Sequence, residues 1–314
     1  MMSYRANTIR REPEGGSGAV AETTLYFVPT FDVEDWFQVQ NLRSAYPFST
    51  WAECELRVVD STHRILNILD GMVGTTGAAV RGTFFVLGWI AKRCPELVRE
   101  IRSRGHELAS HGYSHELCTE LSEKALVQDL QRSKGLLEDL SGGVVRGYRA
   151  PSFSVCPGLF PALDRAGYQY DSSYNSFALH KRYGHLDVRP LAQRGAGFQV
   201  SPTVFELPVS NLRWAGRVWP WAGGGYFRLY PERLFQWGVA RILRREAAYI
   251  FYMHPWEVDP DQPRAVGLKA APRFKHYVHL ERTLFRLEHL LSRFGQCRFV
   301  SCWEYIQRVE AKAA

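Results

Sequence analysis

The sequence predicts an α/β fold with about seven parallel strands, and three observations support this prediction. Short apolar or aromatic segments recur along the chain, most of them end at a polar residue, and stretches with helical apolar spacing follow several of them. Strands that alternate with helices form βαβ units, in which neighbouring strands run parallel. Such units close into a barrel or open into a doubly wound sheet, and in both cases a ligand site lies at the carboxyl ends of the strands.

The predicted elements follow one another from residue 25 onward. The strands are LYFVPTFD (25–32), GTFFVLG (82–88), HELAS (106–110), VVRGY (144–148), YQYD (168–171), VFEL (204–207) and YIFYM (249–253). Helices are expected at 96–105, 122–140 and 158–167 from their apolar spacing and flanking glycines. A later apolar stripe over 280–294, followed by Gly295, predicts a helix on the outside of the barrel.

The length and composition favour one large domain. A hydrophobic content of 46% over 314 residues is sufficient for a substantial core. We expect residues 1–22 to form a disordered polar tail and residues 23–314 to form one domain, with a C-terminal extension from about residue 257. The tail has no apolar run typical of a signal peptide, and no stretch approaches the ~18 apolar residues of a membrane span, so a cytoplasmic protein is expected.

Charge and cysteine usage narrow the functional classes. The net charge of +7 comes from scattered lysines and arginines, which favours a solvated basic surface and gives nucleic-acid binding little support. The six cysteines form no C-x-x-C pair, so they are expected to be reduced and mostly buried.

Ionisable residues lie at or just after the ends of five different predicted strands. They are Asp32, His111, Arg149, Asp171 and His254. If the sheet is parallel, these five side chains converge on one mouth. Each has a more ordinary alternative: an arginine usually pairs with a surface acid, and a lone histidine is more often structural.

Two histidines and a cluster of acids suggest a metal site. In HGYSH, His111 and His115 would lie on one side of a helical turn and could share a cation, although both could equally be hydrogen-bonded turn residues. The stretch TFDVEDWF adds three acids, Asp32, Glu34 and Asp35, which would repel one another unless a cation neutralised them. The alternative is a solvated acidic loop, which the neighbouring aromatic residues make less favourable.

Five ordered motifs resemble those of the polysaccharide deacetylases, the NodB-like carbohydrate esterases. They are TFDVED, HGYSH, RAPSF, YDSS and YMH, and the resemblance covers about residues 25–257. DVEDWF, HPWE and FKHY are further similar to a subgroup found beside exopolysaccharide genes in bacteria with the exosortase system. The resemblance implies a distorted (β/α) barrel that removes N-acetyl groups from N-acetylhexosamine units of a polysaccharide or its precursor, in exopolysaccharide biosynthesis.

The resemblance also implies roles for individual residues. Asp32 matches the general base and Arg149 the residue that orients it. His254 matches the general acid, with Asp171 as its supporting carboxylate. A backbone N–H near Ser152 or Phe153 would bind the oxyanion.

One divalent metal ion, with zinc as the expected metal, is implied for the same site. His111 and His115 match two of its ligands, but Val33 stands where the family has a ligand aspartate. The third ligand is therefore Glu34 or Asp35: strand alternation puts Glu34 on the same face as the base, whereas a turn that starts at Val33 favours Asp35.

The expected partner is an N-acetylated saccharide. Trp36, Ser152, Phe153 and Trp256 are the expected substrate contacts, and the aromatic segment 213–230 either lines a saccharide groove or packs beneath a loop. No membrane span or nucleic acid is expected, although peripheral association with membrane-bound glycan machinery is compatible with the basic charge.

Three other functions stay open at this point. A relative of the same fold could hydrolyse a cyclic imide or ureide, and release of acetate from N-acetylated oligosaccharides would distinguish the two. A non-catalytic glycan-binding module would tolerate loss of Asp32 or His254, and both are present. A non-haem iron oxygenase also uses two histidines and a carboxylate, but the strands lack a jelly-roll pattern.

Overall fold

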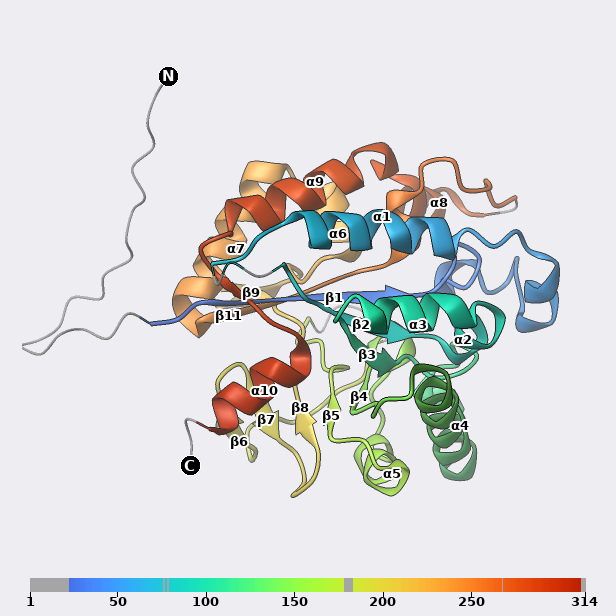
Figure 1. Cartoon of the computed structure of the whole chain (residues 1–314), viewed down its shortest axis with the longest axis horizontal. Coiled ribbons are helices and arrows are strands. Elements are labelled where there is room, and N and C mark those ends of the chain that lie inside the picture. Colours follow the sequence, from blue (N-terminus) through green and yellow to red (C-terminus); the bar gives the residue numbers. More distant parts are fainter. Residues whose placement is uncertain (1–22, 76, 78, 178–182, 267, 312–314) are drawn as a thin grey trace, which may run out of the picture.

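The computed structural model describes residues 23–75, 77, 79–177, 183–266 and 268–311 (Figure 1). The tail predicted at residues 1–22 lies outside the described residues. Within the described part of the chain, no helix is both long enough and apolar enough to cross a membrane.

A parallel sheet forms the centre of the molecule, as the alternating pattern predicts. Among the described residues, seven strands lie side by side and parallel in the order β11, β1, β2, β3, β4, β5, β8, and β12 adds a short parallel pairing with β1. Their bounds are β1 Tyr26–Val33, β2 Thr83–Val86, β3 Glu107–Ser110, β4 Gly147–Tyr148, β5 Tyr170–Asp171, β8 Phe205–Glu206 and β11 Ala248–Met253. The sheet continues with antiparallel β7 (Gly197–Gln199) and β6 (Ala192–Arg194) and curls into a half-barrel, consistent with the distorted barrel that the resemblance implies (Figure 1).

Irregular segments, and not a further strand, bridge the gap between β8 and β11. The Ser210 N–H donates to the Ile250 carbonyl (3.1 Å), and the Tyr252 N–H donates to the Ala222 carbonyl (2.9 Å). Gly223 has φ 141°, and a Cβ there would lie 1.9 Å from the Tyr252 carbonyl oxygen, so only glycine fits. Backbone contacts that no strand pattern predicts therefore span the open side of the half-barrel.

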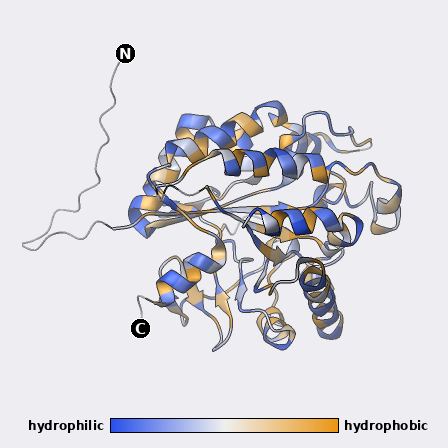
Figure 2. Cartoon of the chain, viewed as in Figure 1, coloured by the Kyte–Doolittle hydropathy of each residue, from blue (hydrophilic) through white to orange (hydrophobic). Residues whose placement is uncertain are grey.

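The helices surround the outside of the curled sheet. Four match the predicted ranges closely: α3 (Pro95–Ser103), α4 (Glu123–Ser141), α5 (Leu159–Ala166) and α9 (Leu280–Arg293). The others were not predicted: α1 (Val58–Gly71), α2 (Gly88–Arg93), α6 (Gly224–Leu229), α7 (Glu232–Glu246), α8 (Ala270–Tyr277) and α10 (Cys302–Glu310). Figure 2 shows that these outer helices combine hydrophobic and hydrophilic residues, as amphipathic helices packed on a sheet do.

The C-terminal part of the chain completes the same sheet. β12 (Arg298–Phe299) runs parallel to the start of β1, and α10 follows it. The first turn of α10 covers the amino ends of the strands, where the Cys302 N–H donates to Thr83 Oγ1 (2.8 Å) and the Trp303 N–H donates to Glu107 (3.0 Å). A small hairpin, β9 (Leu212–Trp214) with β10 (Arg217–Trp219), lies apart from the main sheet.

Side-chain alternation along β1 directs the acidic end of the strand into the barrel. Phe27 and Phe31 pack in the outer core between sheet and helices, whereas Tyr26 and Val28 pack in a second core inside the barrel. Because successive side chains of a strand point to opposite faces, Asp32 at the end of β1 points inward with Tyr26 and Val28.

The six cysteines all lie in the described part of the chain and are unpaired. Three are buried and three are partly buried, in agreement with the expectation of mostly buried thiols.

Candidate functional site

The carboxyl ends of the strands open into one cavity, as predicted for a parallel sheet. Eight residues singled out from the sequence lie in its wall: Asp32, Glu34, His111, His115, Ser152, Phe153, His254 and Trp256. The other walls come from the 3-10 helix η1 (Gln40–Leu42), from α6 and from the end of α8. Arg149 is fully buried beneath it.

Glu34, His111 and His115 form a buried group with the composition of a metal site. One ligand atom from each lies within 4.8 Å of the other two. His111 Nδ1 lies 2.8 Å from the Arg149 carbonyl oxygen, to which it donates, so the lone pair is on Nε2. Glu34 Oε2 lies 2.9 Å from His115 Nε2 but has no hydrogen-bond partner with acceptable geometry, although it is buried. Two imidazoles and an orphaned carboxylate oxygen that face one another fit a divalent cation.

The loop that carries the two histidines is not helical, which corrects the expected helical turn. His115 has φ 56° and Gly112 has φ 73°, so the chain turns through the left-handed region twice. The Tyr113 N–H between them donates to both oxygens of Asp129 (3.2 and 3.1 Å). The histidines meet because of this anchored turn, with ring centroids 5.4 Å apart.

Arg149 contacts Asp32, as the sequence analysis predicts. One terminal nitrogen (Nη1) donates to Asp32 Oδ1 (2.7 Å) and to Thr30 Oγ1 (2.8 Å). The remaining nitrogens bind Ser172, with Nε 3.0 Å from its carbonyl oxygen and Nη2 2.9 Å from Oγ. The guanidinium also stacks 4.1 Å over the Phe85 ring. Arg149 is thus held rigidly, and Asp32 keeps its other oxygen, Oδ2, for the cavity.

His254 follows β11 and is supported by Glu257, not by Asp171. His254 Nδ1 lies 2.8 Å from Glu257 Oε1, while Nε2 faces Glu34 Oε1 (3.2 Å) and Asp32 Oδ2 (3.9 Å). Burial opposes a charge on His254, but Glu34, Glu257 and Asp32 together outweigh it and raise its pKa to about 9. In the absence of a bound cation, these carboxylates therefore favour the protonated imidazole.

The expected contact between Asp171 and His254 is wrong. The Asp171 carboxylate accepts hydrogen bonds from the Ser173 hydroxyl (2.6 Å) and the Ser173 N–H (3.3 Å), and burial raises its pKa. The residue does end a strand, but its side chain takes part in the packing inside the barrel.

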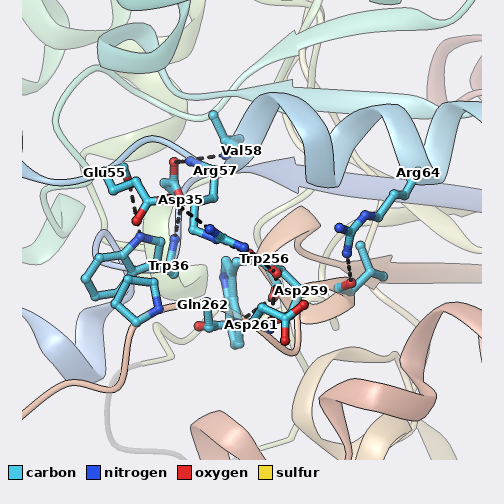
Figure 3. A network of polar contacts seen from close by, with 12 residues as sticks. Asp35, Trp36, Glu55, Arg57, Val58, Arg64, Trp256, Asp259, Asp261 and Gln262 are labelled. Atoms are coloured by element: carbon cyan, nitrogen blue, oxygen red, sulfur yellow. Dashed lines mark hydrogen bonds and ion pairs between the residues drawn. The ribbon is translucent and has the colours of Figure 1, made fainter.

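Asp35 is not part of the ligand group and instead belongs to a network with Trp36, Arg57 and Val58 (Figure 3). Its carboxylate accepts from the N–H groups of Trp36 (2.8 Å), Arg57 (2.8 Å) and Val58 (2.9 Å), and so caps the start of α1. Trp36 is also directed away from the cavity, because its indole N–H donates to the Glu55 carbonyl (3.1 Å). The structure therefore gives no support for Trp36 as a substrate contact.

The same network fixes the 3-10 helix η5 (Pro255–Val258), which follows His254 (Figure 3). Arg57 forms an ion pair with Asp259 (2.5 Å), and Arg64 donates to the Val258 carbonyl (3.0 Å). Gln262 donates to the Trp256 carbonyl (2.8 Å). Sequence reasoning missed these residues, but the H-x-x-E spacing of a capping box could have indicated Glu257.

Ser152 and Phe153 occupy a strained turn at the cavity. Their φ values are 52° and 57°, which is unusual for residues other than glycine and is typical of functional sites. The Phe153 N–H donates to the Ala150 carbonyl (2.9 Å). Of the two N–H groups considered for an oxyanion, Ser152 is therefore the better candidate.

Trp256 and the segment 213–230 contribute to the cavity unequally. Trp256 stacks between His254 and His276, with ring centroids 5.3 and 4.4 Å away. From the segment, Tyr226 lines the cavity, whereas Trp221 is buried in the core. Both interpretations of this segment are thus met in part.

Comparison with known proteins agrees with this geometry. Residues 58–170 match the family model described as polysaccharide deacetylase, and residues 172–307 match a domain of unknown function (DUF3473). The chain carries a polysaccharide deacetylase domain.

Curated relatives of this deacetylase domain match over part of their length. A peptidoglycan deacetylase-like protein of Gibberella zeae is 34% identical over 110 residues, which are 35% of this chain and 31% of that protein. A peptidoglycan deacetylase of Helicobacter pylori is 33% identical over 97 residues, 30% of this chain and 33% of that protein. The chain thus spans about a third of the length of these relatives.

A crystal structure from Mycobacterium smegmatis, assigned to the polysaccharide deacetylases, shares the fold. It superimposes with a TM-score of 0.61 at 20% identity and covers 96% of both chains. The two matches hold different parts of the site: His111, His115 and Arg149 lie within the deacetylase domain, His254 and Glu257 lie within the DUF3473 region, and Asp32 and Glu34 precede both matches.

Proposed function

We propose that the protein is a metal-dependent hydrolase that removes N-acetyl groups from N-acetylhexosamine units of a polysaccharide or its precursor. One observation carries this proposal: the Glu34, His111 and His115 group shares a cavity with a carboxylate held by an arginine and with a histidine whose Nδ1 is held by a second carboxylate. The polysaccharide deacetylase domain and the deacetylase names of the matched relatives agree with it.

Amide hydrolysis needs an activated water and a polarised carbonyl, and the ligand group can hold the cation that supplies both. A divalent cation bound by Glu34, His111 and His115 would supply Lewis-acid activation of the water and of the acetyl carbonyl. The Ser152 N–H would donate to the oxygen that becomes negative in the tetrahedral intermediate.

Asp32 is the proposed general base, and its two oxygens have different tasks. Oδ1 accepts from Arg149, whereas Oδ2 faces the cavity and would take the proton from the attacking water. The N–H groups of Arg149 are taken up by Thr30, Asp32 and Ser172, so Arg149 fixes the direction of the Asp32 carboxylate and does not bind substrate. Arg149 is therefore a positioning residue.

His254 is the proposed general acid. Its Nδ1 is engaged by Glu257, so Nε2 is the atom that would give a proton to the sugar nitrogen as the C–N bond breaks. Water adds its hydroxyl to the acetyl carbon, the amine leaves with the proton from His254, and the products are acetate and a free amino sugar. Transfer of the proton from Asp32 to His254 then restores the starting protonation of both residues.

Release of acetate tests the proposal directly. The purified protein, incubated with N-acetylglucosamine oligosaccharides, should release acetate, and removal of metal by a chelator should stop the reaction until a divalent cation is added back. The His254→Ala variant is the matched control for non-specific hydrolysis. Hydrolysis of a cyclic imide or ureide without acetate release from any N-acetylated glycan would contradict the proposal.

Finer points belong to the same proposal. Zinc as the metal rests on the residue types of the site, and a part in exopolysaccharide biosynthesis rests on the DVEDWF and HPWE motifs. We also propose a cytoplasmic protein with peripheral attachment to membrane-bound glycan machinery. Cell fractionation, and metal analysis of protein purified without added metal, would test these points.

A further inference from the structure

We infer that the segment 274–278, at the end of α8, belongs to the catalytic machinery, because Arg228 connects it to Glu257 and through Glu257 positions His254. The inference rests on the proposed function of His254 as the general acid. It assigns a task to part of the region that matches only a domain of unknown function.

Arg228 is a buried connector between three separate parts of the chain. It lies in α6 and is 1% exposed. Its Nε donates to Glu257 Oε2 (2.6 Å), which belongs to η5. Its terminal nitrogens donate to three backbone carbonyls, those of Lys275 (3.0 Å), His276 (2.9 Å) and Val278 (2.8 Å).

The planar guanidinium makes these contacts interdependent. The last carbonyl groups of a helix have no partner within the helix, and Arg228 satisfies those at the end of α8. Because its N–H groups have fixed directions, Arg228 cannot follow a displaced segment and still bind Glu257 in the same geometry. A lysine has a single nitrogen and could not make these contacts together.

Glu257 passes this constraint on to the proposed acid. Its Oε2 accepts from Arg228, and its Oε1 accepts from the backbone N–H (3.0 Å) and lies 2.8 Å from Nδ1 of His254. Burial alone would raise the pKa of Glu257, but Arg228 and His254 outweigh it and lower the pKa to about 2. A permanently charged carboxylate held at both oxygens keeps Nδ1 protonated and Nε2 directed at the cavity.

The same segment also forms a wall of the cavity. Phe274, Lys275, His276 and Val278 line it together with the metal-binding group, and Phe274 is 57% exposed. A substrate that touches this wall therefore touches the element that positions the acid. Trp256, stacked between His254 and His276, provides a second contact between this segment and the acid.

The test compares Arg228→Met with a matched control, Arg286→Met. Arg286 is also a buried arginine of the region, and it donates to the carbonyls of Arg228 (2.9 Å) and Tyr230 (2.7 Å) without touching Glu257. Turnover is measured on an N-acetylated oligosaccharide, whose amine needs a proton, and on an activated aryl acetate, whose leaving group needs none. Metal content and hydrogen exchange of the backbone are measured in parallel.

A positioning role predicts a selective loss. Arg228→Met should lower kcat on the amide by at least about tenfold, with less than about a threefold change on the aryl acetate and with KM and metal content near wild type. Arg286→Met should affect both substrates equally. An equal loss on both substrates in Arg228→Met would show a merely structural role and would overturn the inference.

A second variant keeps the test decisive if Arg228→Met does not fold. Glu257→Gln keeps the shape of the side chain and removes its charge, so it should show the same selective loss and should also increase hydrogen exchange in residues 270–278, whose backbone Glu257 does not touch. Unchanged exchange there would overturn the link between the two elements. If the wild-type protein releases no acetate, the proposed function fails, whereas the exchange experiment still decides whether the two elements are coupled.

Discussion

Separate replacement of two neighbouring acids, Glu34 and Asp35, should affect different properties of the protein. Glu34→Ala removes a carboxylate whose Oε2 faces His115 without a hydrogen bond, so its main effect should be on metal binding. Asp35→Ala removes a carboxylate that accepts three backbone N–H bonds at the start of α1, so its main effect should be on stability.

The contacts set the size of each effect. Leaving a buried donor without its partner costs about 1–3 kcal/mol, and Asp35→Ala leaves two buried donors, on Trp36 and Val58, and a partly buried one on Arg57, so a loss of at least about 2 kcal/mol in the free energy of unfolding is expected. Loss of residues that merely support metal ligands weakens metal binding by ~10–100-fold, so loss of the ligand Glu34 should weaken metal binding by more than about 100-fold. Burial raises the pKa of Glu34, but the neighbouring histidines outweigh it and lower the pKa to about 2, so Glu34→Ala should also remove a stabilising charge at neutral pH.

Metal analysis after dialysis and urea unfolding in the presence of chelator distinguish the two variants. Glu34→Ala should purify without metal, whereas Asp35→Ala should retain metal and unfold at a clearly lower urea concentration than wild type. Asp35→Asn, which keeps one acceptor oxygen, is the matched control and should fall between wild type and Asp35→Ala. A folded Asp35→Ala protein that has lost its metal, beside a Glu34→Ala protein that keeps it, would refute the assignment.

Three further predictions concern other residues. Arg149→Lys can keep its contact with Asp32 but loses those with Ser172, so kcat should fall by at least about tenfold, or ~1.4 kcal/mol in the barrier, with metal content unchanged; a change in KM alone would make Arg149 a substrate contact. His254→Ala should keep its metal and lose roughly 10²–10⁴-fold in kcat on N-acetylated substrates, with a smaller loss on aryl acetates, and an equal loss on both would remove it as the acid. Burial lowers the pKa of His106 from 6.5 to about 4, so the folded state resists protonation. Above pH 6.5 His106 is neutral in both the folded and the unfolded chain. As the pH drops towards 4, the unfolded chain binds the proton first, so the free energy of unfolding should fall by about 3 kcal/mol. His106→Asn keeps an acceptor for the Gly82 N–H and should reduce the pH dependence of the urea midpoint between pH 7 and 4.5, which an unchanged slope would contradict.

The parallel sheet could be predicted because its physical cause is local. Buried strands need apolar runs, and the polar residue at the end of each run marks where the strand leaves the core. That rule brought Asp32, His111 and His254 to one cavity and placed Arg149 beneath it. It could not assign Asp171, because the end of a strand fixes the layer of a side chain and not its partner.

The choice between Glu34 and Asp35 depends on where the extended backbone ends. β1 extends to Val33, and the chain turns there as well as further on: the Glu34 N–H donates to the Asp32 carbonyl (3.0 Å), and the Gln38 N–H donates to the Asp35 carbonyl (3.0 Å). Features of both competing predictions are therefore present, and the side-chain contacts decide between them: Glu34 lies with His111 and His115, whereas Asp35 accepts from the N–H groups at the start of α1. A strand end and a turn within one or two residues of each other lie within the uncertainty of any boundary derived from sequence.

The contacts that the sequence could not predict share one feature, which is that their partners come from distant parts of the chain. Arg228 and Glu257 are 29 residues apart, and Arg57 and Asp259 are 202 residues apart. No periodicity records such pairs, since each depends on the complete packing of α1, α6 and η5. In this protein those pairs surround His254, and the ligand histidines lie in the other family match. The proposed reaction therefore needs both regions. The deacetylase domain provides the ligand histidines and the arginine that holds the base, and the C-terminal region provides the proposed proton donor, which reaches its position only when that region is folded against the domain.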